Sequence, residues 1–279
     1  MNGVARKALI GLAVLALTGL TWAVGVRLIE SGSSDHQTRE AACDVHVGSA
    51  NFLLELDQAE HAATIAAVGK RMGLPDRAVT IALAVALQES GLHNFDHGDR
   101  DSLGLFQQRP SQGWGTPAEI LTPSHAAETF FVHLARVDGW ESAPVTVAAQ
   151  EVQRSATPTA YAAWEPRAVV LTQALTGAVP AAIRCQFPSR SAGSGPASAS
   201  STPAVPLDQA ITQELGSPAL GAALSATRGW TVSAWLVAHA QTYGITSVAF
   251  AGRTWMATSG TWSKPEPVAA DSQVRITTS

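Results

Sequence analysis

The sequence predicts a mainly α-helical protein: an all-α domain over residues 43–187, preceded by a single N-terminal transmembrane helix and followed by a small α/β domain over residues 207–279. Three observations predict this organisation. An uncharged stretch near the N-terminus is long enough to cross a bilayer, and apolar residues recur at helical spacing between the two cysteines. The stretch 188–206 is rich in Ser, Ala, Pro and Gly and cannot bury a core, so we expect it to be a linker.

Residues 1–30 are expected to anchor the chain in a membrane. The run from Ala8 to Val26 carries no charge and spans about 28 Å at helical rise, close to the roughly 30 Å hydrocarbon core of a bilayer. Arg6 and Lys7 precede the run and favour a cytoplasmic N-terminus. A cleaved secretory signal is the alternative, and either reading exports the rest of the chain. The polar residues 31–42 are expected to be a spacer.

Composition narrows the classes of partner. The 279 residues have a formal net charge of -4, only 14% of them are charged, and no long basic run occurs. Phosphate binding needs a clustered positive surface, so nucleic acid is not an expected partner. We expect no cofactor, and neutral glycan or protein remains as the partner class.

The expected elements follow from hydrophobic periodicity and from Gly and Pro at their ends. Between the cysteines, helices are expected over residues 59–72, 75–90, 124–134, 145–152 and 158–175. In the C-terminal domain we expect helices over 207–224 and 230–240, and a hairpin that pairs 245–251 with 253–256.

Glu89 is the candidate catalytic acid. It stands in the last turn of the expected 75–90 helix, where unpaired carbonyls and the negative end of the helix dipole disfavour an ionised carboxylate. A carboxyl that keeps its proton there can act as a general acid, whereas the alternative is a solvated residue at a helix end. A loop rich in Gly and Asp follows, and then the segment Gly104-Leu105-Phe106-Gln107-Gln108.

Glu89-Ser90 followed by this Gly-Leu-Phe-Gln segment resembles the lysozyme-like fold of soluble lytic transglycosylases and goose-type lysozymes. The longer string from Ala86 to Gly115 resembles a group of actinobacterial cell-wall proteins with that fold, and the match covers roughly residues 43 to 185. The resemblance implies a lysozyme-like domain that cleaves peptidoglycan glycan strands between N-acetylmuramic acid and N-acetylglucosamine, with Glu89 as the catalytic residue.

The resemblance also implies further site residues. Goose-type lysozymes orient water with loop aspartates, which points to Asp99 and Asp101, whereas lytic transglycosylases need only the glutamate and use the acetamido group of the substrate. Ser90 and the amides of Gln107 and Gln108 are expected to bind sugar, and amides can do so without charge.

Gln150 stands where many lytic transglycosylases carry a tyrosine that approaches the catalytic glutamate. Tyr161 is the candidate that replaces this tyrosine, so both are expected substrate-binding residues. A candidate from another class remains open: a non-catalytic cell-wall-binding or scaffold protein that keeps the groove.

Cys43 and Cys185 are the only cysteines, and they bracket the segment that carries the resemblance. Exported proteins form disulfides, so we expect a bridge between the two.

The loop after Glu89 could alternatively hold a metal ion. The spacing of its residues fits neither a zinc motif nor a calcium loop, so we expect no metal. The residues considered are His93, Asp96, His97, Asp99 and Asp101.

The C-terminal domain is similar to a small α/β module found behind actinobacterial cell-wall hydrolases and in other exported proteins of those organisms. The likeness is carried by the segment Trp235–Ala240 and by Arg253-Thr254-Trp255. Its tryptophans and His239 are expected to be core residues rather than binding residues, because a domain of about 70 residues needs large aromatics to fill its core. The linker leads us to expect a mechanically separate domain.

Overall fold

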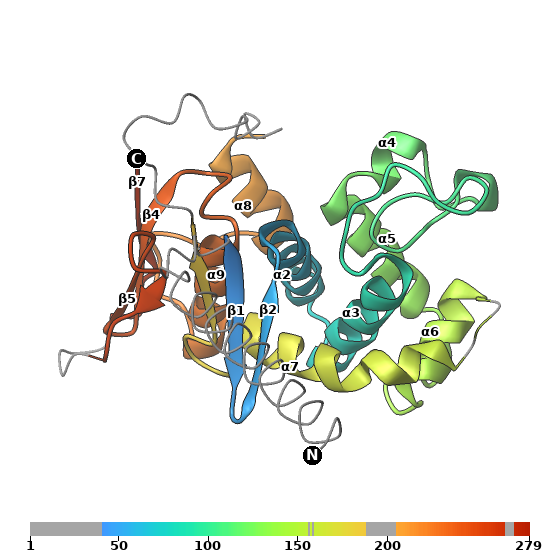
Figure 1. The fold of residues 1–279 in the computed structure, drawn as a ribbon, viewed down its shortest axis with the longest axis horizontal. Coiled ribbons are helices and arrows are strands. Elements are labelled where there is room, and N and C mark those ends of the chain that lie inside the picture. Colours follow the sequence, from blue (N-terminus) through green and yellow to red (C-terminus); the bar gives the residue numbers. More distant parts are fainter. Residues whose placement is uncertain (1–40, 156, 158, 188–204, 266–270) are drawn as a thin grey trace, which may run out of the picture. The chain divides into compact units, whose positions relative to one another are not determined.

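The computed structural model describes residues 41–155, 157, 159–187, 205–265 and 271–279 (Figure 1). The expected transmembrane helix over residues 8–26 and most of the expected linker lie outside the described residues. Within the part of the chain that the structure describes, no helix is both long and apolar enough to cross a bilayer.

The described chain is a mixed α/β protein rather than a mainly α one, because two small antiparallel sheets accompany its helices. The α-helices are α2 (Leu56–Arg71), α3 (Asp76–Ser90), α4 (Pro117–Ile120), α5 (Pro123–Leu134), α6 (Val145–Gln153), α7 (Glu165–Leu175), α8 (Leu207–Leu215) and α9 (Ala226–Ala238). Short 3-10 helices cover Pro110–Gln112 and Ala160–Trp164.

The first sheet has the strand order β2-β1-β3, and the second has the order β6-β5-β4-β7. The strands of the first sheet are β1 (Ala42–Val47), β2 (Ala50–Leu54) and β3 (Ile183–Gln186). The strands of the second are β4 (Ile245–Phe250), β5 (Arg253–Met256), β6 (Thr261–Trp262) and β7 (Arg275–Thr278).

The expectation of an all-α domain over residues 43–187 is wrong, because both cysteine segments are strands. In β1, Cys43 and Val45 are buried, and in β3, Ile183 and Cys185 are buried, which is the period of two that a strand requires. Each of these strands is too short for its alternating pattern to be recognised in the sequence. The two strands also lie far apart in the chain, so no local feature of the sequence indicates that they pair.

The expected disulfide is present and joins the two sheet segments. Cys43 and Cys185 are direct register partners in β1 and β3, and their sulfurs are bonded across a sequence separation of 142 residues. In the chain-entropy model a loop of that length stabilises the fold by about 5 kcal/mol.

The expected helix over 158–175 is divided in the structure. Its first part is the 3-10 helix that contains Tyr161, and α7 begins only at Glu165, with Pro166 in its first turn, where a proline needs no hydrogen-bond donor. Similarly, α8 ends at Leu215 instead of residue 224, because Gly216 adopts a positive φ of 70°.

The helix α3 lies at the centre of the helical part (Figure 1). All residues from Ala78 to Leu87 are buried, since α2, α5, α6 and α7 pack around it. A helix that is apolar on every side is a core helix. Its last turn, with Glu89, emerges from this core.

Residues 207–279 pack directly on the helical part, so residues 40–279 form one compact unit instead of two mechanically separate bodies. The Trp262 indole donates a hydrogen bond to the Ile183 carbonyl at 2.9 Å, and the Thr231 hydroxyl donates to the Thr176 carbonyl at 2.8 Å. The domain limits themselves stay predictions.

The aromatic residues of the C-terminal part fill its core, as expected. The side chains of Trp230, Trp235 and Trp255 are buried, and Trp262 packs against them partly buried. His239 is also buried, and its Nδ1 lies 2.9 Å from the Trp235 carbonyl, one turn earlier.

Candidate active site

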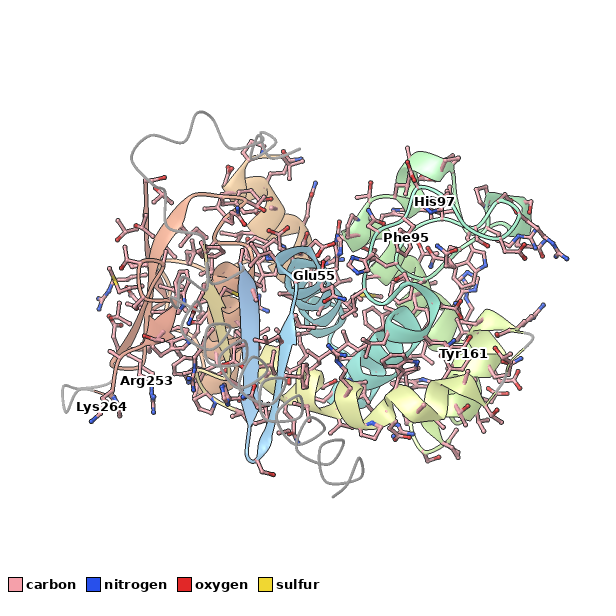
Figure 2. The ribbon with its side chains drawn as sticks, in the orientation of Figure 1. Glu55, Phe95, His97, Tyr161, Arg253 and Lys264 are labelled. Carbon is pink, nitrogen blue, oxygen red and sulfur yellow. A yellow bond between two sulfur atoms is a disulfide. The ribbon has the colours of Figure 1, made fainter. Side chains whose placement is uncertain are left out.

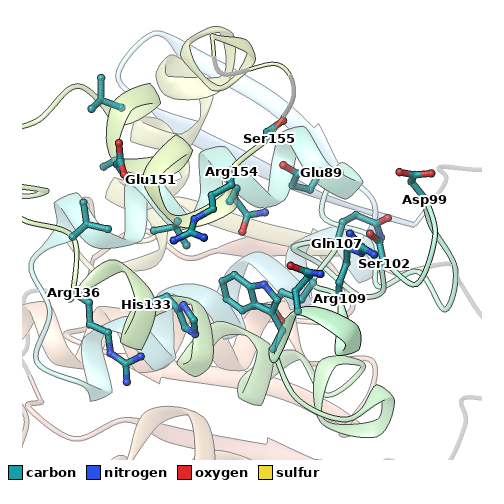
Figure 3. Close-up of a pocket in the computed structure, with 18 of the residues that line it drawn as sticks. Glu89, Asp99, Ser102, Gln107, Arg109, His133, Arg136, Glu151, Arg154 and Ser155 are labelled. Atoms are coloured by element: carbon teal, nitrogen blue, oxygen red, sulfur yellow. The ribbon is translucent and has the colours of Figure 1, made fainter.

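A cleft of about 1140 Å³ opens where α3 ends, between the loop that follows this helix and the helices α5 and α6 (Figure 3). The cleft is strongly charged, which differs from the uncharged groove that the sequence suggested. Its ionisable lining residues are Glu89, Asp99, Arg100, Arg109, His133, Arg136, Asp138, Glu151 and Arg154.

Glu89 lines the cleft and is held by Tyr161. The Tyr161 hydroxyl donates a hydrogen bond to Glu89 Oε1 at 2.6 Å. Burial, followed by this hydrogen bond to a carboxylate, raises the pKa of Tyr161 above its usual range. The tyrosine therefore remains a donor at any physiological pH and fixes one oxygen of the carboxyl group.

The turn of α3 that carries Glu89 is fixed on both sides. The Trp164 indole donates a hydrogen bond to Gln88 Oε1 at 2.7 Å. Gly91 ends the helix with a positive φ of 64°, a conformation that glycine adopts without strain. Glu89 is therefore held in place before any ligand binds.

Ser90, an expected sugar-binding residue, contacts the backbone of its own chain. Its side chain is buried, and its hydroxyl lies 2.7 Å from the Leu105 carbonyl and 3.1 Å from the Ala86 carbonyl. The hydroxyl instead joins the end of α3 to the Gly104–Gln108 segment. Ser90 thus positions this segment below the cleft.

Gln107 and Gln108 both line the cleft. The Gln107 amide donates to the Gly104 carbonyl at 3.2 Å. The Gln108 amide donates to the Ala126 carbonyl at 3.2 Å, and its buried Oε1 has no hydrogen-bond partner among the described residues. This oxygen is a buried acceptor for which the described residues supply no donor.

The two loop aspartates are separated by the fold. Asp99 lines the cleft at its rim, and its carboxylate is 93% exposed. Asp101 accepts hydrogen bonds from Arg109 Nε at 2.6 Å and from the Ser111 amide at 2.8 Å. The hydrogen bonds from Ser111 and Arg109 hold the pKa of Asp101 well below its usual range. Asp101 is thus a structural anion that shapes the loop.

Gln150 is turned away from the position that the resemblance implies. Its amide donates to the Ser155 carbonyl at 3.0 Å, and the cleft is lined by its neighbours Glu151 and Gln153 instead. The Gln153 amide donates to the Phe106 carbonyl at 2.9 Å. Of the two candidates for the missing tyrosine contact, Tyr161 is the one that touches Glu89.

Sequence reasoning missed His133, Arg136 and Arg154, which line the part of the cleft farther from Asp99 in Figure 3. The Trp114 ring stacks on the His133 ring with centroids 4.2 Å apart. Burial and the nearby guanidinium groups of Arg136 and Arg154 lower the pKa of His133. His133 and Arg136 lie at the end of α5 and Arg154 lies at the end of α6, so no local spacing in the sequence marks the three as a set.

The metal site considered in the loop is not assembled. His97 pairs with Asp96, and Asp101 pairs with Arg109. Among the described residues, Glu55, Asp57 and His93 place their ligand atoms within 4.8 Å of one another. None of these three lines the cleft, and Figure 2 shows Glu55 well apart from Tyr161.

No protein-family model and no curated protein matches the sequence. The resemblance to lysozyme-like proteins therefore stays a prediction from the motif around Glu89.

Proposed function

We propose that this protein is a membrane-anchored, extracytoplasmic enzyme of the lysozyme-like class that cleaves peptidoglycan glycan strands between N-acetylmuramic acid and N-acetylglucosamine. The observation that carries the proposal is Glu89 at the end of a buried helix, facing a cleft, with Oε1 held by Tyr161. The tyrosine leaves Oε2 to hold the proton that a general acid delivers.

In the proposed reaction, Glu89 transfers this proton to the glycosidic oxygen while the bond from that oxygen to C1 breaks, and the bonding electrons stay on the oxygen. The acetamido oxygen of the substrate attacks C1 and stabilises the resulting positive charge. The Glu89 carboxylate then takes the proton from a hydroxyl whose oxygen attacks C1, and the bond from C1 to the acetamido oxygen breaks, which restores the acetamido group. Water gives a reducing end, and the C6 hydroxyl of the muramyl unit gives an anhydro sugar.

Two further features support this function and its place outside the cytoplasm. The disulfide between Cys43 and Cys185 is a bond that persists in oxidising compartments. The amides of Gln107 and Gln108 line the cleft beside Glu89 and match the hydroxyl and N-acetyl groups of glycans.

Replacing Glu89 tests the proposal directly. Glu89→Gln keeps the shape of the side chain but has no proton to transfer, so glycan cleavage should fall at least about 100-fold while the protein folds normally. The measurement is mass analysis of soluble products released from peptidoglycan by the full chain. Undiminished cleavage by this variant would contradict the proposal. A wild-type protein that sediments with peptidoglycan but releases no product would favour the non-catalytic binding function.

Asparagine variants of the loop aspartates separate the two outcomes of the reaction. Asp101→Asn should lower cleavage less than tenfold beyond any loss of folded protein, because both Asp101 oxygens are engaged by Arg109 and Ser111. Asp99→Asn should lower cleavage about as strongly as Glu89→Gln only if a carboxylate must orient water. Anhydro-muropeptides from an active Asp99→Asn variant would assign transglycosylation, and reducing ends lost with Asp99 would assign hydrolysis.

A further inference from the structure

One part of the cleft holds two arginines, Arg136 and Arg154, that form no ion pair with a described carboxylate. Figure 3 shows His133, Arg136 and Arg154 on one side of the view and Asp99 on the other. Arg100 pairs with Asp99, and Arg109 pairs with Asp101. Within the described residues, by contrast, the side chains of Arg136 and Arg154 have no ion pair or hydrogen bond.

The two acidic residues of the same region form no ion pair with these arginines. Asp138 and Glu151 line the cleft, yet neither carboxylate lies within 4 Å of a described cation. The charged groups that act on His133 are Arg136 and Arg154, and both lower its pKa. The electrostatic environment around the His133 ring is therefore positive.

Arg154 has a backbone conformation that is unfavourable for arginine. The residue ends α6 in the left-handed conformation, with φ of 51°, and its amide donates to the Gln150 carbonyl at 2.8 Å. Glycine or asparagine adopts this conformation at lower cost than arginine. A costly backbone conformation at a cleft residue points to a role for its side chain.

Trp114 gives the region a flat apolar surface. Its ring stacks on His133 at 4.2 Å with an angle of 24° between the planes, and both rings line the cleft. Guanidinium groups beside such a surface suit a ligand that joins an apolar sugar face to an anion, because a guanidinium binds a carboxylate through two parallel hydrogen bonds.

We infer that His133, Arg136 and Arg154 form a subsite that binds a carboxylate of the substrate. This carboxylate belongs to the anionic substituent of a muramyl unit and lies apart from the bond that is cleaved. This inference rests on the proposed function. The substituent is a lactyl group, whose carboxylate is either free or linked as an amide to a peptide with carboxylates of its own. The subsite would thus select glycan strands that carry muramyl carboxylates over neutral N-acetylglucosamine polymers.

Binding measurements test the subsite without turnover. In the full chain with Glu89→Gln, the Kd is measured for three probes: glycan strands with intact peptides, strands stripped of peptides so that the lactyl carboxylate is free, and N-acetylglucosamine oligomers. Arg136→Gln and Arg154→Gln should each weaken binding of carboxylate-bearing strands about tenfold, leave the oligomers unchanged, and show a smaller effect at high salt. Arg154→Lys should recover part of the loss.

Arg275→Gln is the matched control, since it removes the same charge from the exposed strand β7 and should change no Kd. Tighter binding of the peptide-bearing strands would assign the anion to the peptide, and tighter binding of the stripped strands would assign it to the lactyl group. Equal losses for all three probes, or unchanged binding of the carboxylate-bearing strands, would overturn the subsite.

Cleavage of the glycan strands is measured separately with protein that keeps Glu89. Arginine-dependent binding without cleavage would overturn the proposed function and leave the subsite. Cleavage combined with arginine-independent binding would overturn the subsite alone.

Discussion

At the scale of single residues, the contact between Tyr161 and Glu89 decides how the candidate acid is used. A hydroxyl that donates to one carboxyl oxygen restricts the group's rotation and assigns the transferable proton to the other oxygen. The same hydrogen bond keeps the carboxylate oriented when Glu89 serves as the base in the second step. Tyr161 is thus a positioning residue.

Tyr161→Phe should lower the cleavage rate about tenfold, because the ring still fills its buried site while the hydroxyl is lost. Without the hydroxyl the carboxyl group of Glu89 is free to rotate, so kcat should fall while the KM for the glycan stays close to the wild-type value. The measurement is kcat and KM, determined separately on soluble glycan strands. Tyr243→Phe is the control, because it removes a hydroxyl from the C-terminal part, where the ring packs near Trp235. A loss that appears mainly in KM, or that only follows the fraction of unfolded protein, would assign Tyr161 a packing role only.

The sequence alone predicted some of these contacts and not others. Glu89, Gln107 and Gln108 all line one cleft, and they could be grouped from the sequence because a helix end and a short following segment are local features. Ser90 and Gln150 were expected at the substrate and instead bind backbone carbonyls. An amide or hydroxyl can serve either purpose, and only the surrounding fold decides between them.

At the scale of elements, the segment after α3 depends on a close approach between its own backbone at Gly104 and the backbone of Ile120 at the end of α4. Gly104 has a positive φ of 74°, and its amide donates to the Phe95 carbonyl at 2.7 Å. A Cβ atom at this position would lie 2.7 Å from the Ile120 carbonyl oxygen. The glycine therefore lets the segment with Gln107 and Gln108 pack against the end of α4.

Gly104→Ala should destabilise the protein by the cost of a left-handed alanine, about 1 to 2 kcal/mol, and by roughly 1 to 3 kcal/mol more for the contact with Ile120. Gly48→Ala is the matched control, because Gly48 has a φ of 60° and a Cβ atom there would meet nothing within 4 Å. The free energy of unfolding of both variants is measured by chemical denaturation. The difference between their losses of stability is the cost of the contact with Ile120. Equal losses of stability would show that the segment can shift away from α4.

There is a physical reason why some elements could be predicted from the sequence and others could not. The helix α3 could be predicted because Pro75 and Gly91 bound one continuous apolar run. The sheet β2-β1-β3 could not, because its strands are short and β3 pairs with β1 from the far end of the helical part. The cations of the cleft were also missed, because single arginines in different segments converge only in the folded chain.

At the scale of the whole molecule, polar groups join the C-terminal part to the helix α2. Glu214 of α8 accepts hydrogen bonds on one oxygen from the Thr64 hydroxyl and the Trp235 indole, each at 2.7 Å. His61 of α2 reaches the Leu92 carbonyl just beyond α3 with its Nδ1 at 2.7 Å. Burial raises the pKa of Glu214 and lowers the pKa of both His61 and His239. The interface therefore disfavours charge of either sign.

Glu214→Gln tests this interface through the pH dependence of stability. A carboxyl whose pKa is higher in the folded protein than its unfolded value of 4.5 lowers the free energy of unfolding as pH rises through the window between the two values. Glutamine keeps an acceptor for Thr64 and Trp235 and carries no charge. The variant should match the wild type below about pH 4.5 and be more stable at neutral pH, by about 1 kcal/mol or roughly 2 to 4 °C in Tm.

The histidines of the interface have folded pKa values below the unfolded value of 6.5, so their contribution to stability is lost as pH falls below that value. They are present in both proteins, so this loss largely cancels in the difference between the variant and the wild type. Glu141→Gln, on the exposed surface, controls for the change in net charge. Thermal unfolding from pH 4 to pH 8 is the measurement. A Glu214→Gln protein that is less stable than the wild type at neutral pH would show that the ionised carboxylate gains more from Thr64, Trp235, His61 and Arg71 than it loses by burial.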